Sequence, residues 1–144
     1  MNTSIKDMLS ENINVCSNPS ELKITDIRVA NINGAPKHCP LIKVYTNQGI
    51  VGYGEVRDAS SATYALMLKS RLIGENPCNV DKLFRRIKQF GGPSRQGGGV
   101  SGLEIALWDL AGKAWGVPLY QMLGGKFRDK VRVYGDTDVD GKHT

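Results

Sequence analysis

Hydrophobic residues recur at helical spacing between Gly97 and Gly125, and this stretch predicts the central element of the fold. Ser101 and Glu104 have the spacing of a capping box, in which two side chains satisfy free backbone amides at a helix start. Two apolar stripes come next, the first at Leu103, Leu107, Leu110 and Ala114 and the second at Ile105, Trp108 and Trp115. A helix with apolar residues over so much of its circumference is predicted to be buried on two sides.

The same stretch predicts where this helix ends and which element comes after it. Gly116 is expected to take a left-handed conformation after the last helical turn. Pro118 then opens a short second helix that reaches Leu123 and ends at Gly124 and Gly125.

Two features inside the long helix bear on what holds it in place. Gly112 lies in mid-helix, where glycine costs about 1 kcal/mol relative to alanine, so we expect a neighbouring backbone to approach it closely. Asp109 and Lys113 form an i, i+4 pair worth about 0.2 to 0.5 kcal/mol. Packing rather than charge is therefore expected to hold the helix.

Alternating apolar and polar positions predict three strands before the helices. Residues Lys23 to Ile32 have the period of a half-buried strand. The loop Asn33 to Pro40 separates this strand from two β-rich runs, Leu41 to Thr46 and Ile50 to Glu55. A three-residue connection, Asn47 to Gly49, predicts that these two runs pair as an antiparallel hairpin.

Two further helices are predicted between the hairpin and the central helix. Ser60 or Ser61 caps the first, Gly74 ends it, and its apolar side is made of Ala62, Ala65, Leu66, Leu68, Leu72 and Ile73. Asn79 caps the second, whose apolar residues are Val80, Leu83, Phe84 and Ile87. The glycine-rich stretch Phe90 to Gly99 is expected to be a loop.

This order of elements favours an α+β domain, with a small antiparallel three-stranded sheet and a helical bundle on one of its faces. Val131 to Tyr134 predicts a further strand with no partner in the sequence. We therefore expect a flexible N-terminal extension over residues 1–22, a first domain over 23–129, and the start of a second domain over 130–144, whose remainder is absent. Such a fragment would expose apolar surface around Trp108 or Trp115.

The run ALWDLAGKAWGVPLYQMLGGKFRDKVRVY, together with the upstream hairpin LIKVYTNQGIVGYGE, resembles the N-terminal capping domain of the mandelate racemase and muconate lactonizing branch of the enolase superfamily. The likeness covers about Lys23 to Tyr134. It implies that Val131 to Tyr134 is the first strand of a modified (β/α) barrel.

The resemblance also implies a chemistry. Enzymes of this kind abstract the proton alpha to a carboxylate and use Mg²⁺ to stabilise the charge that develops. Their metal ligands and bases lie at the ends of barrel strands. No position among residues 1–144 matches those motifs, so we expect no catalytic residue and no metal ligand in this chain.

In the resembling family, two loops of the capping domain close over the substrate, and here they correspond to Asn33 to His38 and Val56 to Ala59. Lys37, His38 and Arg57 would donate to an acid sugar, and Asp58 would accept from a hydroxyl. The alternative is that these four are ordinary polar loop residues.

The composition of the chain argues against some classes of binding partner. The net charge is +5 and the pI about 9.2, but basic residues are scattered among acids, so we expect no nucleic-acid partner. Three widely spaced cysteines, Cys16, Cys39 and Cys78, predict free thiols in a reducing cytoplasm. No signal peptide or membrane span is visible, and a cytoplasmic protein without a membrane partner is expected.

Several partial motifs lack the neighbouring structure that their function would require. Gly97, Gly99 and Gly102 match a dinucleotide fingerprint, but no hydrophobic parallel strand precedes them. Asp136, Asp138, Asp140 and Gly141 resemble the first half of an EF-hand loop, but they come after a predicted strand and the closing Glu would fall beyond Thr144, so a solvated turn at the strand end is preferred. In the barrel interpretation, Asp136 would line the active-site mouth.

Other candidate chemical groups are isolated. His38 and His143 have no companion at metal-ligand spacing. Glu104 and Asp109 are five residues apart and fall on different faces of the helix, which argues against a catalytic pair.

The function predicted from the sequence is a Mg²⁺-dependent enolase-superfamily enzyme, with sugar-acid dehydration as the preferred reaction and a small carboxylate as substrate. The protein is expected to be a homo-oligomer in its full-length form. Racemisation, epimerisation or cycloisomerisation are alternatives within the superfamily. A different alternative is a noncatalytic α+β module whose basic helix, Asn79 to Phe90, holds an anionic partner.

Overall fold

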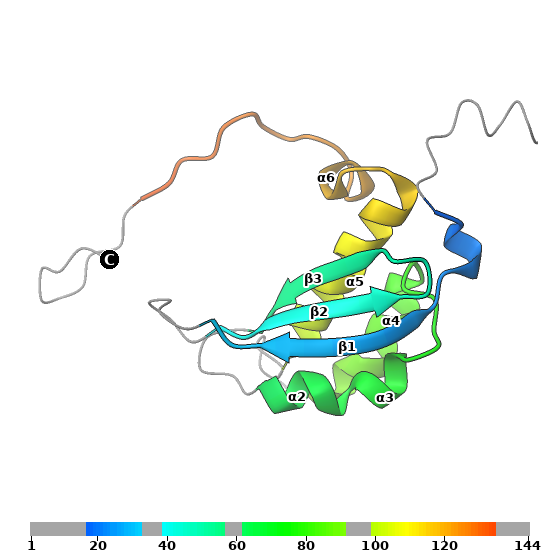
Figure 1. The fold of residues 1–144 in the computed structure, drawn as a ribbon. Helices are drawn as coiled ribbons and strands as arrows, with labels where there is room; N and C mark the ends of the chain where they lie inside the picture. Colours follow the sequence, from blue (N-terminus) through cyan, green and yellow to red (C-terminus); the bar gives the residue numbers. More distant parts are fainter. Residues whose placement is uncertain (1–16, 33–38, 57–61, 92–98, 135–144) are drawn as a thin grey trace, which may run out of the picture.

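A three-stranded antiparallel sheet with helices on one face forms the core of the computed structural model, which describes residues 17–32, 39–56, 62–91 and 99–134 (Figure 1). The strands lie in the order β1-β2-β3. Their bounds are Ile24–Ala30 for β1, Leu41–Thr46 for β2 and Val51–Glu55 for β3. The helices are α2 (Ala62–Met67), α3 (Lys69–Leu72), α4 (Val80–Ile87), α5 (Val100–Trp115) and α6 (Leu119–Met122), with 3₁₀ turns η1 (Pro19–Glu21) and η2 (Lys88–Gly91).

The predicted α+β fold and its hairpin are confirmed. Strands β2 and β3 pair antiparallel, and Gly49 takes φ +77° in the turn between them. Strand β1 is shorter at both ends than predicted and carries an irregularity at Thr25, where the register shifts. The inward positions of β1 and β2, among them Ile27, Ile42 and Val44, are buried against the helices.

Helix α5 occupies the centre of the core, as predicted. The residues of its first stripe, Leu103, Leu107, Leu110 and Ala114, are all fully buried. The second stripe is not: Ile105 is 52% exposed and Trp115 is 53% exposed, while Trp108 is half-buried. Within this domain the second stripe is therefore not covered, and the expected exposure of apolar surface around the tryptophans is confirmed.

Glycines allow α5 to lie directly on β3, the strand with which it makes its most extensive contacts. A Cβ atom built on Gly54 would lie 2.0 Å from the Gly102 carbonyl oxygen, and one on Gly52 would lie 2.2 Å from the Ala106 oxygen. From the helix side, a Cβ on Gly102 would lie 2.6 Å from the Glu55 oxygen. The helix and strand backbones are thus closer than any side chain at these positions would permit.

The predicted close approach at Gly112 is also confirmed, because a Cβ there would lie 2.9 Å from the carbonyl oxygen of Val117. The chain turns at Gly116, which takes φ +66° and whose amide donates to the Gly112 and Lys113 carbonyls. Helix α6 begins at Leu119, one residue after Pro118, and positive φ angles at Gly124 and Gly125 lie just beyond its end.

The capping box at the start of α5 is wrong. The helix begins at Val100, so Ser101 lies inside it, and the N-cap is Gly99 with φ +96° and no side-chain cap hydrogen bond. A Cβ on Gly99 would lie 2.9 Å from Ala65, so the packing of α2 against this turn sets the start of the helix.

The first of the two predicted helices is divided into α2 and α3 at Leu68. Ala65, Leu68 and Leu72 are buried as predicted, but Leu66 and Ile73 are 42% and 39% exposed and do not belong to the apolar side. Helix α4 begins after Asn79 and buries Val80, Leu83 and Ile87 with Phe84 partly buried, as predicted, although the Asn79 side chain makes no cap hydrogen bond.

Both ends of the described chain add to this picture. Residues 17–22 pack on the domain, with Leu22 fully buried and Asn76 Nδ2 donating to the Pro19 carbonyl at 2.7 Å. Residues 1–16 lie outside the described part.

At the C-terminal end of the described chain, residues 126–134 run without a strand partner among the described residues (Figure 1). Phe127, Val131 and Val133 are 88%, 70% and 84% exposed.

Two side chains of α5 occupy the free edge of β3. The Asp109 carboxylate accepts a hydrogen bond from the Tyr53 amide at 2.8 Å, and the Lys113 ammonium donates to the Val51 carbonyl at 2.9 Å. The two side chains also pair with each other at 2.6 Å. Because an uncovered edge can pair with a strand of another molecule, this pair protects β3 as well as joining it to α5.

The glycine contact between α5 and β3 predicts a large loss of stability in Gly54→Ala. The added methyl group would force the two backbones apart, and we expect the free energy of unfolding to fall by about 3 kcal/mol or more in urea denaturation. Gly49→Ala is the control, because its site has open space and only the left-handed conformation opposes the change, at about 1 to 2 kcal/mol. Equal losses in the two variants would contradict the close contact.

The cover on the β3 edge predicts that Asp109→Ala lowers stability by about 1 kcal/mol and raises self-association, since the Tyr53 amide loses its acceptor. The matched control is Asp81→Ala on α4, which breaks an i, i+4 pair with Arg85 whose side chains are 75% and 72% exposed. The Asp81→Ala substitution should lower the free energy of unfolding by less than about 0.5 kcal/mol and leave self-association unchanged. Urea denaturation and light scattering measure the two effects, and identical behaviour of both variants would argue against edge protection.

Candidate functional site

The residues predicted to contact substrate, Lys37, His38, Arg57 and Asp58, all lie outside the described residues. The residues that flank them are described, however. Leu41 pairs with Ala30 on one side and with Glu55 on the other, so the ends of all three strands form one row.

The bases of the two predicted substrate loops are joined at that row. The Val56 amide donates to the Pro40 carbonyl at 2.8 Å, and Val56 is fully buried. Pro40 comes after the segment 33–38 and Val56 precedes the segment 57–61. The described residues that flank the two segments therefore lie at the same end of the sheet, close to the start of α5, where Gly102 meets Glu55.

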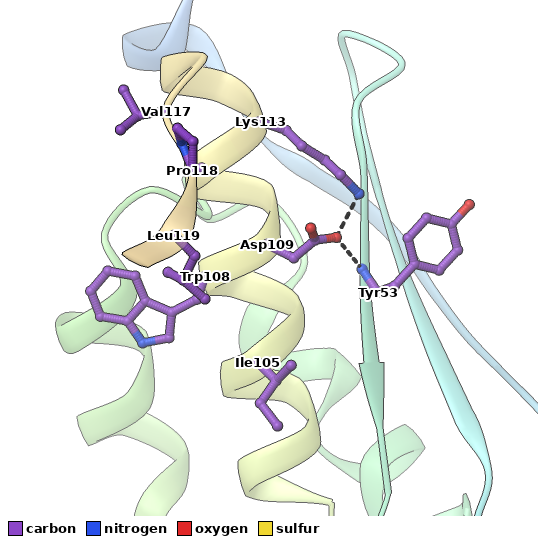
Figure 2. A pocket seen from close by; sticks show the side chains of 9 residues that line it. Tyr53, Ile105, Trp108, Asp109, Lys113, Val117, Pro118 and Leu119 are labelled. Atoms are coloured by element: carbon purple, nitrogen blue, oxygen red, sulfur yellow. Dashed lines mark hydrogen bonds and ion pairs between the residues drawn. The ribbon is translucent and has the colours of Figure 1, made fainter. Parts of the chain in front are cut away.

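A groove of about 480 Å³ runs along the outer face of α5, between the β3 edge and the start of α6 (Figure 2). Its lining is mostly apolar and consists of Tyr53, Ile105, Trp108, Asp109, Gly112, Lys113, Val117, Pro118 and Leu119. The Asp109 carboxylate contacts the Tyr53 amide and the Lys113 ammonium, as Figure 2 shows, and Lys113 also donates to the Val51 carbonyl of β3. These two charged groups therefore do structural work and are not a catalytic acid and base.

A second hollow of about 440 Å³ lies on the other side of Trp108, beside the start of α4. Cys78, Asn79, Val80, Asp81 and Lys82 line it with Trp108. Burial raises the pKa of the Cys78 thiol, and a hydrogen bond with Trp115 opposes that shift only in part. A thiol with a raised pKa is a poor nucleophile at neutral pH, so this cysteine is not an activated one.

The outward face of the sheet carries cations stacked on aromatic rings. Arg28 and Lys43 lie 5.1 and 4.9 Å from the centre of the Tyr45 ring, and Lys113 lies 4.7 Å from that of Tyr53. Hydrogen bonds from Lys69 and Arg28 lower the pKa of Asp26 to about 2. Much of the positive charge on this face is thus held in contacts within the domain.

The basic side of α4 is also largely neutralised. Arg86 and Lys82 both bind the Glu75 carboxylate, at 2.6 and 3.2 Å, and these hydrogen bonds lower its pKa. Arg85 pairs with Asp81. The role of Glu75 was not visible in the sequence, because seven and eleven residues separate it from its two partners.

Neither a metal-binding cluster nor a membrane-spanning helix is found among the described residues. Among them, no group of three or more His, Cys, Asp or Glu side chains lies close enough together to hold a metal ion. Within the same residues, none of the helices has the length and hydropathy that crossing a membrane requires. Other sequence candidates lie outside the described part: Gly97, His143, Asp136, Asp138, Asp140 and Gly141.

Comparisons with known proteins agree with this architecture. The family model of the mandelate racemase / muconate lactonizing enzyme N-terminal domain matches residues 13–124. The D-xylonate dehydratase of Haloferax volcanii is 38% identical over 95% of this chain and 35% of its own length. The D-galactonate dehydratase of Pectobacterium atrosepticum is 35% identical over 78% of this chain and 31% of its own length.

Solved structures show the same fold. A member of the enolase superfamily from Salmonella Typhimurium is 37% identical, with a TM-score of 0.67 over 85% of this chain and 36% of that one. A mandelate racemase/muconate lactonizing enzyme-like protein from Rubrobacter xylanophilus is 34% identical, with a TM-score of 0.69 over 85% of this chain and 34% of that one. This chain spans about a third of the length of the curated relatives it matches. With its sheet, its helices and the match over residues 13–124, the chain belongs to the mandelate racemase/muconate lactonizing enzyme family of the enolase superfamily, as its N-terminal domain.

Proposed function

We propose that this chain is the substrate-closing cap of a sugar-acid dehydratase. The observation that carries the proposal is the shared base of segments 33–38 and 57–61, which the Val56–Pro40 hydrogen bond joins at one end of the sheet. The names of the two relatives above, D-xylonate and D-galactonate dehydratase, support an acid sugar as the substrate class.

The role proposed for the cap is to bind the end of the substrate away from the reacting carbon and to exclude water. Lys37, His38 and Arg57 would donate hydrogen bonds to the sugar acid, and Asp58 would accept from a hydroxyl. A rigid base matters because a donor displaced by about 1 Å loses much of its effect on the reaction rate. The buried Val56 and the contact of Gly102 with Glu55 supply such a base.

The proposed reaction removes the proton alpha to the carboxylate and then expels the β-hydroxyl group as water. Mg²⁺, when bound, would stabilise the negative charge that develops on the carboxylate oxygens. The described residues do not fit such an ion, because they contain no cluster of suitable ligands. The metal ligands and the base are therefore proposed to lie outside the described residues, in the barrel domain that the family resemblance implies.

The proposed domain organisation follows from the family to which the chain belongs. Residues 23–129 would be the capping domain, residues 1–22 an extension of which 17–22 pack on it, and residues 130–144 the start of a barrel. The exposed apolar side chains of Val131 and Val133 support the last of these, because a barrel strand would bury such residues.

The alternatives differ in what supports them. Racemisation, epimerisation and cycloisomerisation need the same cap, so the named dehydratase relatives are the only reason to prefer dehydration. The noncatalytic module has less support, because Lys82, Arg85 and Arg86 are already paired with acids within the domain.

The proposal predicts dehydration of D-xylonate or D-galactonate by the polypeptide extended through the codons after Thr144. In that polypeptide Arg57→Ala should lower kcat/KM by about 10- to 100-fold, which corresponds to the loss of one charge-assisted hydrogen bond. Arg85→Ala, which removes an exposed arginine of α4, is the control and should change kcat/KM by less than about twofold.

Product formation is measured as the 2-keto-3-deoxy acid. If the folded polypeptide dehydrates no sugar acid, or if Arg57→Ala and Arg85→Ala behave alike, the proposal is wrong. Salt-sensitive retention on heparin that is lost on reversal of Arg85 and Arg86 would instead favour the noncatalytic module.

A further inference from the structure

A third hollow, of about 230 Å³, lies between α2, α3 and η2 and shares no lining residue with the two hollows beside Trp108. Its lining is mostly apolar and consists of Tyr64, Met67, Leu68, Ser70, Arg71 and Phe90. Tyr64, Met67 and Phe90 are 54%, 66% and 43% exposed. Three large hydrophobic side chains are thus left open to solvent around one small hollow.

Arg71 is the charged residue of this hollow, and an aromatic ring supports its side chain. The guanidinium carbon lies over the Phe90 ring, 4.3 Å from the ring centre. A guanidinium over a ring keeps the N–H groups in its own plane, and these can still donate two parallel hydrogen bonds to a carboxylate. Phe90 therefore supports Arg71 without using its donors.

No acidic side chain uses these donors within the described part of the chain. The Arg71 guanidinium makes neither an ion pair nor a hydrogen bond there. By contrast, Lys69 on the same helix pairs with Asp26. Arg86 of α4 pairs with Glu75 and also donates to the Arg71 carbonyl at 3.1 Å, which ties the backbone of α3 to α4. The hollow therefore combines apolar walls with one positive charge that has no counter-charge among the described residues.

We propose that this hollow binds a small carboxylate with an apolar body, with Arg71 on the carboxylate and Phe90 and Met67 against the body. The charge of the hollow is complementary to an anion, and its apolar lining is complementary to the body of the ligand. Its volume is below the range of about 300 to 1,000 Å³ that is usual for ligand pockets, so the ligand is a small one.

A sugar acid does not suit this hollow, because most of its hydroxyl groups would lie against apolar side chains without hydrogen-bond partners. The proposed ligand is therefore of a different class from the proposed substrate of the cap. A site for it would give the domain a binding function in addition to substrate closure.

The test uses cyclohexanecarboxylate as the probe and follows the backbone amide signals of the 144-residue chain by NMR. We expect saturable shifts at amides of α3 and η2. Cyclohexanecarboxamide has the same apolar body without the charge and should bind about tenfold more weakly or worse, because the charge-assisted hydrogen bonds are lost. D-Galactonate should leave these amides unshifted.

Substitutions of Arg71 test which group recognises the carboxylate. Arg71→Gln should weaken binding of the probe by about tenfold or more, and Arg71→Lys, which keeps the charge but not the planar donors, should recover only part of the affinity. Arg85→Gln is the matched control, because it changes the net charge equally at a side chain that is 72% exposed and outside the hollow. It should change the affinity by less than about twofold.

Equal affinities for the carboxylate and its amide would overturn the proposal, as would equal affinities in Arg71→Gln and Arg85→Gln. Shifts that appear in the 144-residue chain but not in the polypeptide extended through the codons after Thr144 would also overturn it, because the hollow would then be covered in the longer protein. All of these readouts measure binding, so the presence or absence of dehydratase activity bears only on the proposed function.

Discussion

The direct contact between the backbones of α5 and β3 is the constraint on which the rest of the domain depends. Gly52 and Gly54 of the strand and Gly102 of the helix leave no room for side chains at the contact. Without Cβ atoms there, the helix lies close enough to the sheet for its buried stripe to fill the core with side chains from β1 and β2. The hydrophobic stripe supplies the favourable energy, and the glycines determine the distance at which it acts.

The same contact separates a buried side of α5 from an exposed one and lies near the proposed substrate loops. At the end of the sheet, Gly102 lies against Glu55, beside the hydrogen bond that joins the bases of the two proposed substrate loops. The sheet covers the inner face of α5, whereas Ile105 and Trp115 on its other side stay about half exposed. The contact of one helix with the sheet thus lies beside the described bases of both proposed loops.

Several basic residues of the chain are held in ion pairs within the domain. Glu75 binds both Lys82 and Arg86, while Asp26 binds Lys69 and Arg28. Lys113 joins α5 to the edge of β3. These charges stabilise contacts between elements that the core alone would leave less tightly defined, so a positive net charge does not by itself indicate an anionic partner.

The sequence by itself determined the strands of the hairpin, the turn at Gly49, the buried stripe of α5 and its end at Gly116, because each depends on periodicity or on the conformational freedom of glycine. Only the tertiary structure decided the start of α5 at Gly99, where contact with Ala65 sets the turn, and the exposure of Ile105 and Trp115. Local pattern identifies which residues are apolar but not which neighbour covers them. Contacts such as Glu75 with Arg86 or Gly54 with Gly102 join residues far apart in the chain, and folding alone brings them together.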